Sequence, residues 1–161
     1  MSISYVICPV NEEMLTYGQD FGVSIASDTA HGRFPVVDEL ISIMESIPGH
    51  RLTHVFQERN FALTIESEEL VEIQPNGPFR QHSVPMTYLH LHGALSPDSH
   101  PRWMAMRGDM NVMLAFLRRL AETCGPQVFF YEGDGIPWFI VSGSDAPLGR
   151  ESCPESWCQI H

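Results

Sequence analysis

The stretch GDMNVMLAFLRRLAETCGP, residues 108–126, gives the clearest secondary-structure signal in the chain. Its apolar side chains recur at three- and four-residue spacing, which places them in one wide stripe along a helix: Met110, Met113, Leu114, Leu117, Leu120, Ala121 and Cys124. Asp109 suits the N-cap, and Gly125 followed by Pro126 is a strong helix stop. The stretch predicts an amphipathic helix whose other face carries Asn111, Ala115, Arg118 and Glu122.

Strands are predicted on both sides of this helix. QVFFY, residues 127–131, and IPWFIV, residues 136–141, are apolar runs joined by the turn residues EGDG. Pro137 favours a sheet edge for the second of them, because proline cannot donate a ladder hydrogen bond. Before the helix, MTYLHLHG at residues 86–93 predicts another strand, and residues 94–107 predict a loop.

The first half of the chain shows a similar order of elements. SYVICPV, residues 4–10, predicts a strand, and residues 16–35 fit either a short strand or an ordered loop. FPVVDELISIMESIPG, residues 34–49, has helical apolar spacing and ends at a proline-glycine stop. LTHVFQERNFALTIES, residues 52–67, changes to period two and predicts a hairpin, and ELVEIQP at residues 69–75 is a candidate third strand.

These elements predict an α+β fold in which an antiparallel sheet carries two main helices on one face. The order strand, helix, strand, strand occurs in both halves, but no residue identity supports a duplication, so chance similarity stays open. The 161 residues are the usual size of one domain. We expect a single domain over residues 1–141 and an irregular C-terminal tail over residues 142–161.

Charge is the most unusual feature of the composition. Twenty acidic side chains face nine basic ones, a formal net charge of −11, and all nine basic residues are arginine. The absence of lysine excludes Schiff-base chemistry and a phosphate-loop lysine. Such a surface repels nucleic-acid phosphates and anionic membranes and attracts basic proteins, although solubility alone would also explain it. Without a basic leader or a run of about 20 apolar residues, a soluble cytoplasmic protein is expected.

The strand at residues 86–93 carries the histidines that matter most for function. Alternation puts Met86, Tyr88, His90 and His92 on one face of that strand. Two histidines at this spacing can bind a metal when a third ligand converges, as in the H-x-H of cupin barrels, but the cupin glycine and glutamate pattern is missing. The preferred interpretation is structural, with no metal and no cofactor.

The alternative is a metal-dependent enzyme. The paired strand-helix-strand-strand halves are loosely similar to the vicinal oxygen chelate fold, whose repeats hold a metal with histidine and glutamate. That resemblance implies His90 or His92 together with Glu66 or Glu72 as ligands. The chain has no G-x-S-x-G, G-x-G-x-x-G, Walker or H-E-x-x-H motif that would point to other catalytic chemistry.

A cluster of carboxylates is the candidate partner-binding site. IESEELVE places Glu66, Glu68, Glu69 and Glu72 within seven residues, near a predicted sheet edge, and the turn at residues 132–135 adds Glu132 and Asp134. Like charges this close repel one another unless solvent or a cationic partner screens them. The cluster is either a solvated turn or a docking surface for a basic protein.

From Gly108 to Val141, where an amphipathic helix leads into QVFFYEGDGIPWFIV, the chain resembles the immunity proteins of bacterial polymorphic-toxin and type VI secretion systems. The resemblance lies in overall character: a small, acidic α+β chain without a catalytic motif. It implies a protein that binds a cognate toxin, often over the toxin's active site, and that performs no chemistry of its own.

Overall fold

The computed structural model describes residues 4–57, 61–67, 71–72, 82–83, 86–133, 135–141 and 147–149. In chain order its elements are β1 (Ser4–Pro9), α1 (Glu12–Asp20), α2 (Val37–Glu45), β2 (His50–Gln57), β3 (Phe61–Ser67), β4 (Val71–Glu72), β5 (His82–Ser83), β6 (Met86–His92), β7 (Trp103–Arg107), α3 (Met110–Cys124), β8 (Gln127–Tyr131) and β9 (Pro137–Ile140). The fold is of the α+β class that the sequence predicts. Among the described residues, no helix has the length and apolar character needed to cross a bilayer.

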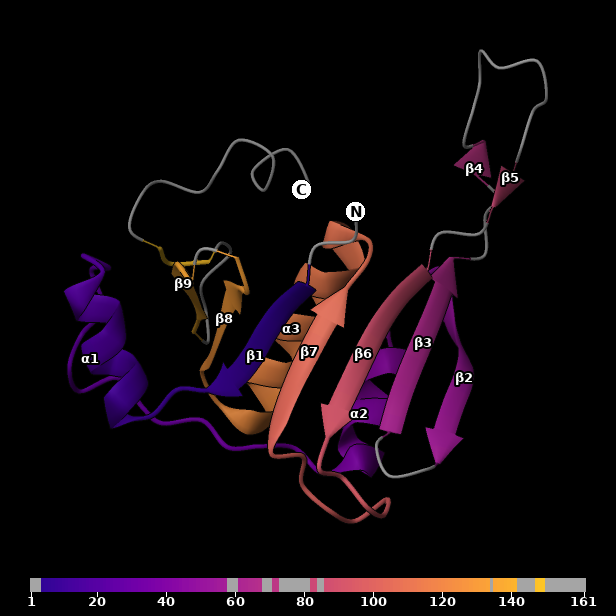
Figure 1. The fold of residues 1–161 in the computed structure, drawn as a ribbon, viewed down its shortest axis with the longest axis horizontal. Helices are drawn as coiled ribbons and strands as arrows, with labels where there is room; N and C mark the ends of the chain where they lie inside the picture. The colour runs from indigo at the N-terminus through magenta and orange to yellow at the C-terminus, as the bar shows by residue number, and fades with distance from the viewer. Residues whose placement is uncertain are drawn as a thin grey trace.

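Seven strands form one antiparallel sheet in the order β2-β3-β6-β7-β1-β8-β9 (Figure 1). The first strand of the chain therefore lies inside the sheet, between β7 and β8. β9 is the last strand of the sheet, as Pro137 at its start predicts, and Leu148 beyond it makes a single bridge to Phe139. β4 and β5 form a separate two-stranded ladder, so residues 71–72 do not extend the main sheet.

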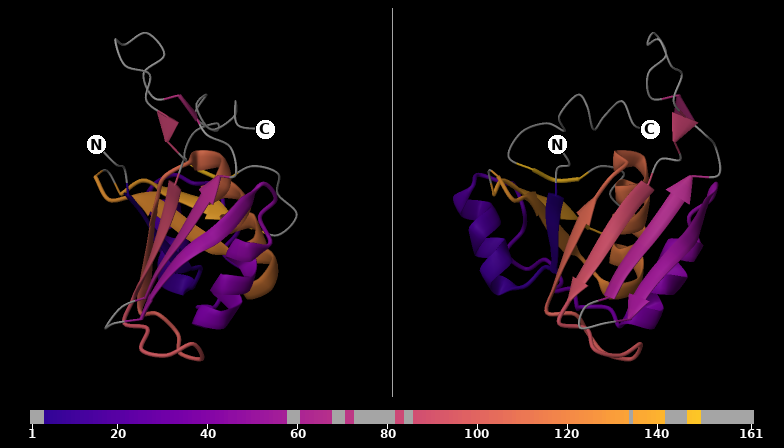
Figure 2. Two further views of the ribbon diagram at one scale, coloured as in Figure 1. Left: turned by 90° about the vertical axis from the view of Figure 1, so that its right-hand side faces the viewer. Right: turned by 45° about the vertical axis from the view of Figure 1, so that its right-hand side comes forward.

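Helices α2 and α3 share one hydrophobic core with one face of the sheet (Figure 2). Leu40 and Met44 of α2 and Leu117 and Leu120 of α3 belong to this core. The strands contribute alternate residues to it: Leu63, Ile65, Leu89, Leu91, Met104, Met106, Ile7 and Phe129. We call this side of the sheet the helical face. Its composition confirms the apolar stripe that the sequence predicts for the second main helix.

Helix α1 packs on the opposite face, over β8 and β9. Leu15 of α1 shares a small hydrophobic core with Val128 of β8 and Phe139 of β9. The next residues on these strands, Phe129 and Ile140, belong to the core on the helical face, so Val128 and Phe139 point to the other side of the sheet. The approach is close, because a Cβ on Gly18 would lie 2.6 Å from the ring of Phe139. The sequence did not predict this helix and assigned residues 16–35 to a strand or loop. Its start is fixed by Asn11, whose side chain accepts a hydrogen bond of 2.8 Å from the backbone N–H of Met14.

Two further differences from the sequence-based expectation affect the sheet. Residues 103–107 form β7, a central strand, where a loop was expected over 94–107. The first main helix is shorter than residues 34–49 and begins at Val37, after an N-cap at Val36. The two halves keep a similar order of elements, but their hairpins join the sheet differently. In the β2–β3 hairpin the first strand, β2, is the outermost strand of the sheet, whereas in the β8–β9 hairpin the first strand, β8, pairs with β1.

Candidate functional site

The part of the second face formed by β1, β3, β6 and β7 is covered by no described helix. Its polar and aromatic side chains come from two neighbouring strands, and the register sets Tyr88 beside Arg107 and His92 beside Trp103. Tyr88, His90, His92 and Arg107 are half-exposed, and Trp103 is 40% exposed. We call this surface the open face. It contains the four residues that the sequence placed on one side of the histidine strand.

Two ring contacts hold the aromatic residues of the open face in place. The His92 imidazole lies flat on the Trp103 indole, with 3.4 Å between ring centroids and 6° between planes. The Arg107 guanidinium carbon lies 4.8 Å from the centre of the Tyr88 ring, in range for a cation–π contact. Both contacts join directly paired positions on β6 and β7, where side chains are close neighbours.

The two histidines are poor proton acceptors in this setting. Burial lowers the pKa of His90, and the nearby charges of Arg107 and His92 lower it further. Burial also lowers the pKa of His92, against an opposing effect of the Glu132 carboxylate. Since a free histidine has a pKa of about 6.5, both imidazoles are neutral at pH 7. The open face therefore gains no positive charge from them.

The alternative metal site of His90 or His92 with Glu66 is not assembled by the sheet register. Glu66 pairs with Met86 and Ala62 pairs with His90, so Glu66 lies four residues along the strand from His90. At about 3.4 Å per residue this is a separation of about 14 Å, far beyond a shared coordination sphere. Glu72 pairs with His82 in the separate ladder. Within the described ranges, no group of three histidine, cysteine or carboxylate side chains is arranged to hold a metal.

The two members of the predicted acidic cluster whose side chains are described, Glu66 and Glu132, are four strand spacings apart, about 19 Å across the sheet. Glu66 and Glu132 lie at the same end of the sheet, because Met86, Ser4 and Tyr131 all belong to that end. Glu66 is on β3, which is one strand in from the edge strand β2. Its carboxylate contacts Arg51 at 3.4 Å, whereas Glu132 is exposed. Of the other members, Glu68, Glu69 and Asp134 lie outside the described residues, and Glu72 is described in its backbone alone.

Helix α1, which packs on the same side of the sheet as the open face, adds carboxylates that the sequence analysis missed. Glu12 and Glu13 are exposed in its first turn. The pairing of Ile7 with Met104 puts the next residue of β1, Cys8, level with Trp103. Burial, and then the charge of Glu13, raise the pKa of the Cys8 thiol to about 11, so this cysteine is no nucleophile at neutral pH. Glu12 and Glu13 at the start of α1, Glu66 on β3 and Glu132 after β8 lie on the elements that form or flank the open face, and we call them the acidic rim.

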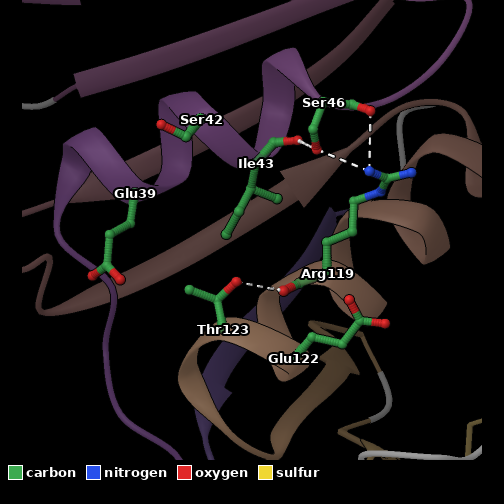
Figure 3. A pocket seen from close by; sticks show the side chains of 7 residues that line it. All are labelled: Glu39, Ser42, Ile43, Ser46, Arg119, Glu122 and Thr123. Atoms are coloured by element: carbon green, nitrogen blue, oxygen red, sulfur yellow. Dashed lines mark hydrogen bonds between the residues drawn. The ribbon is translucent and has the colours of Figure 1, made fainter.

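A shallow groove between α2 and α3 is the other candidate site (Figure 3). Its volume is about 370 Å³, and it is lined by Glu39, Ser42, Ile43, Ser46, Arg119, Glu122 and Thr123. Arg119 donates to the backbone oxygen of Ser46 at 3.0 Å and to its hydroxyl at 2.9 Å. Glu39 accepts two hydrogen bonds from Arg33, which with a backbone bond lower its pKa to about 2. The Arg119 contacts join α3 to the C-terminal end of α2, whereas the Arg33–Glu39 contacts join α2 to the segment that precedes it.

The chain matches no family model, no curated protein and no solved structure.

Proposed function

We propose that this chain is a non-catalytic acidic binding protein that neutralises a cognate basic toxin or effector by direct binding, as bacterial immunity proteins do. One observation carries the proposal: negative charge on the surface is in excess and is not paired. Among the described residues, the exposed carboxylates that form no ion pair are Glu12, Glu13, Asp20, Asp28, Asp38, Glu45, Asp98, Glu122 and Glu132. Arg33 and Arg51, by contrast, are already paired with Glu39 and Glu66.

Unpaired surface charge of one sign acts on the rate of encounter. A field of this kind steers an oppositely charged partner and raises its association rate, and the gain falls steeply as salt screens the charges. The same field opposes binding to nucleic acids and anionic membranes. The proposed partner is therefore a basic toxin domain, met in the cytoplasm where the toxin would act.

The proposed contact residues are Glu66, Glu68, Glu69, Glu72, Glu132 and Asp134. The common location of Glu66 and Glu132 at one end of the sheet supports a shared surface for the described members of this set. Charges at the border of an interface mainly change the association rate, and buried apolar residues mainly set the dissociation rate. The carboxylates are thus expected to control how fast the toxin arrives.

Co-expression with a toxin encoded beside the gene tests the proposal directly. Cells that produce the toxin are expected to grow only when this chain is also produced. With purified proteins, the association rate constant is expected to fall steeply between low and high salt, and Glu68→Arg with Glu69→Arg is expected to slow association several-fold. Glu45→Arg with Glu122→Arg, on the helical layer, is the matched control and should change the rate much less. A rate that ignores both salt and the first pair would show that the acidic surface serves solubility alone.

A further inference from the structure

Within the described part of the chain, the helices are distributed unequally over the two faces of the sheet. Two helices cover the helical face, whereas α1 covers only the β8–β9 end of the other. Among the described residues, four large hydrophobic side chains are exposed: Met86, Leu95, Trp103 and Tyr131. Met86 and Trp103 lie on the open face, at opposite ends of the paired strands β6 and β7. Between them the half-exposed rings of Tyr88, His90 and His92 continue this surface along β6, and a continuous exposed apolar and aromatic surface marks a candidate contact site.

The aromatic side chains of this surface are fixed before any partner arrives. Trp103 is stacked on His92, and Tyr88 lies under Arg107. Tryptophan and tyrosine held in one rotamer lose little conformational entropy on binding, which is why they dominate the energetics of interfaces. The open face thus provides rigid aromatic contacts along the paired strands β6 and β7.

The charges around these aromatic side chains favour a partner of positive charge. Arg51 is paired with Glu66, and Arg107 lies against Tyr88, so the described cations of the face are already engaged. Glu12, Glu13 and Glu132 make no ion pair within the described part of the chain. A second copy of this chain would bring two acidic rims together and would be repelled. A cationic partner would meet complementary charge along the border.

We propose that the open face is the docking surface for a basic protein segment, with the Trp103–His92 stack as its apolar anchor and the acidic rim as its charge contact. The segment would lay apolar side chains on the stack and direct arginine or lysine side chains toward Glu13 and Glu132. This inference rests on the proposed function in so far as the natural partner is the basic toxin. It adds the surface that the toxin would contact and the residues that would set the dissociation rate.

A synthetic peptide that alternates arginine with leucine is a defined probe for this surface. Titrated into ¹⁵N-labelled protein, it is expected to shift the backbone amide signals of β6 and β7 and leave those of α2 and α3 unchanged. A peptide with glutamate in place of arginine is expected not to bind. Shifts centred on the α2–α3 groove, or equal binding of the acidic peptide, would overturn the proposal. So would self-association of the free protein through the open face, measured by sedimentation.

Variants then separate the anchor from general surface effects. Trp103→Ala is expected to weaken peptide binding at least tenfold, and His92→Ala several-fold, while Leu95→Ala, an exposed apolar control outside the face, has no effect. Glu132→Arg is expected to weaken binding, and Glu122→Arg on α3 is its matched control. Thermal melts establish that each variant is folded, and His92→Ala tests the anchor even if Trp103→Ala is unstable. Equal weakening by Glu132→Arg and Glu122→Arg would contradict a specific rim.

The two proposals can fail separately. If the cognate toxin binds and Trp103→Ala and His92→Ala leave its dissociation rate unchanged, the open face is not the docking surface, and the immunity function stands. If no toxin is neutralised but the basic peptide binds at β6 and β7 and the variants weaken it, the docking surface stands, and the immunity function does not.

Discussion

Replacing Leu117 by alanine tests the packing of the helical layer on the sheet. Leu117 lies in the middle of α3, is 1% exposed and belongs to the large core between the helices and the sheet. The substitution removes three carbon atoms from that core, and at about 0.8 kcal/mol for each buried methylene the transfer cost alone is about 2.4 kcal/mol. The cavity left behind adds to this cost, so we expect a loss of about 2–5 kcal/mol in the free energy of unfolding.

Urea unfolding followed by circular dichroism measures this loss, and in a chain of this size it should lower Tm by about 4–20 °C. Glu122→Ala is the control, because Glu122 is exposed on the same helix and should change stability by no more than about 0.5 kcal/mol. Arg118, which the sequence places on the polar side, is only half-exposed and is less suitable. Comparable losses at Leu117 and Glu122 would show that the core does not lie where the structure puts it.

Three further outcomes are expected. Gly108→Ala should destabilise the protein by more than about 1 kcal/mol, because the φ of Gly108 is +128° and a Cβ there would lie 2.5 Å from the backbone oxygen of Met86 on β6. Gly49 has a φ of +73° and no atom within 4 Å of such a Cβ, so Gly49→Ala should destabilise the protein less. Equal losses of stability would refute the steric argument. The folded state favours neutral His90 and His92, so the free energy of unfolding should fall as the pH drops below about 6.5. The fluorescence of Trp103, which is stacked on His92, should decrease as His92 is protonated, with a titration midpoint below that pH. A midpoint above that pH would contradict the burial of His92. Protein purified without chelator should contain far less than one equivalent of zinc, iron, nickel or manganese, and a full equivalent that His90→Ala with His92→Ala removes would restore the metal hypothesis.

The elements that the sequence predicts well are those whose burial is one-sided. The stripe of α3 faces the core throughout its length, and Asp109 caps the helix as expected by accepting a hydrogen bond of 3.1 Å from Val112. The alternation of β6 survives because one side packs under the helices and the other stays half-exposed. In both elements the spacing of the apolar residues along the sequence matches the side that is buried in the structure.

β7 could not be recognised for the opposite reason. Met104, Ala105 and Met106 are all buried, because the strand lies in the middle of the sheet and small Ala105 is covered by its larger neighbours on the open face. Continuous burial removes the alternation on which strand prediction depends, and methionine and alanine are not typical strand residues. The helix α1 was missed because its apolar face is narrow. Its available signal was the cap Asn11 followed by two glutamates in the first turn.

The missed strand explains why the candidate site was only half predicted. The sequence placed Tyr88, His90 and His92 on one face, which the structure confirms, but Trp103 comes from β7 and so could not be assigned as the partner of His92. The carboxylates of α1 were missed along with their helix. Spacing within one strand can be read from a sequence, whereas contacts between strands depend on the sheet order, and this order is set by long-range packing.

The central position of β1 has a consequence for how the chain folds during synthesis. β1 is made first, yet its two neighbours in the sheet are β7 and β8, whose pairing positions begin at Met104 and Gln127. Until those residues have left the ribosome, this apolar strand has no sheet partner, and its pairing then closes very long loops, which slows folding. Before β8 is made, β1 can pair with β7 alone and is left as an unpaired sheet edge, so the core that β8 contributes to through Phe129 is completed only after Gln127–Tyr131 have been synthesised.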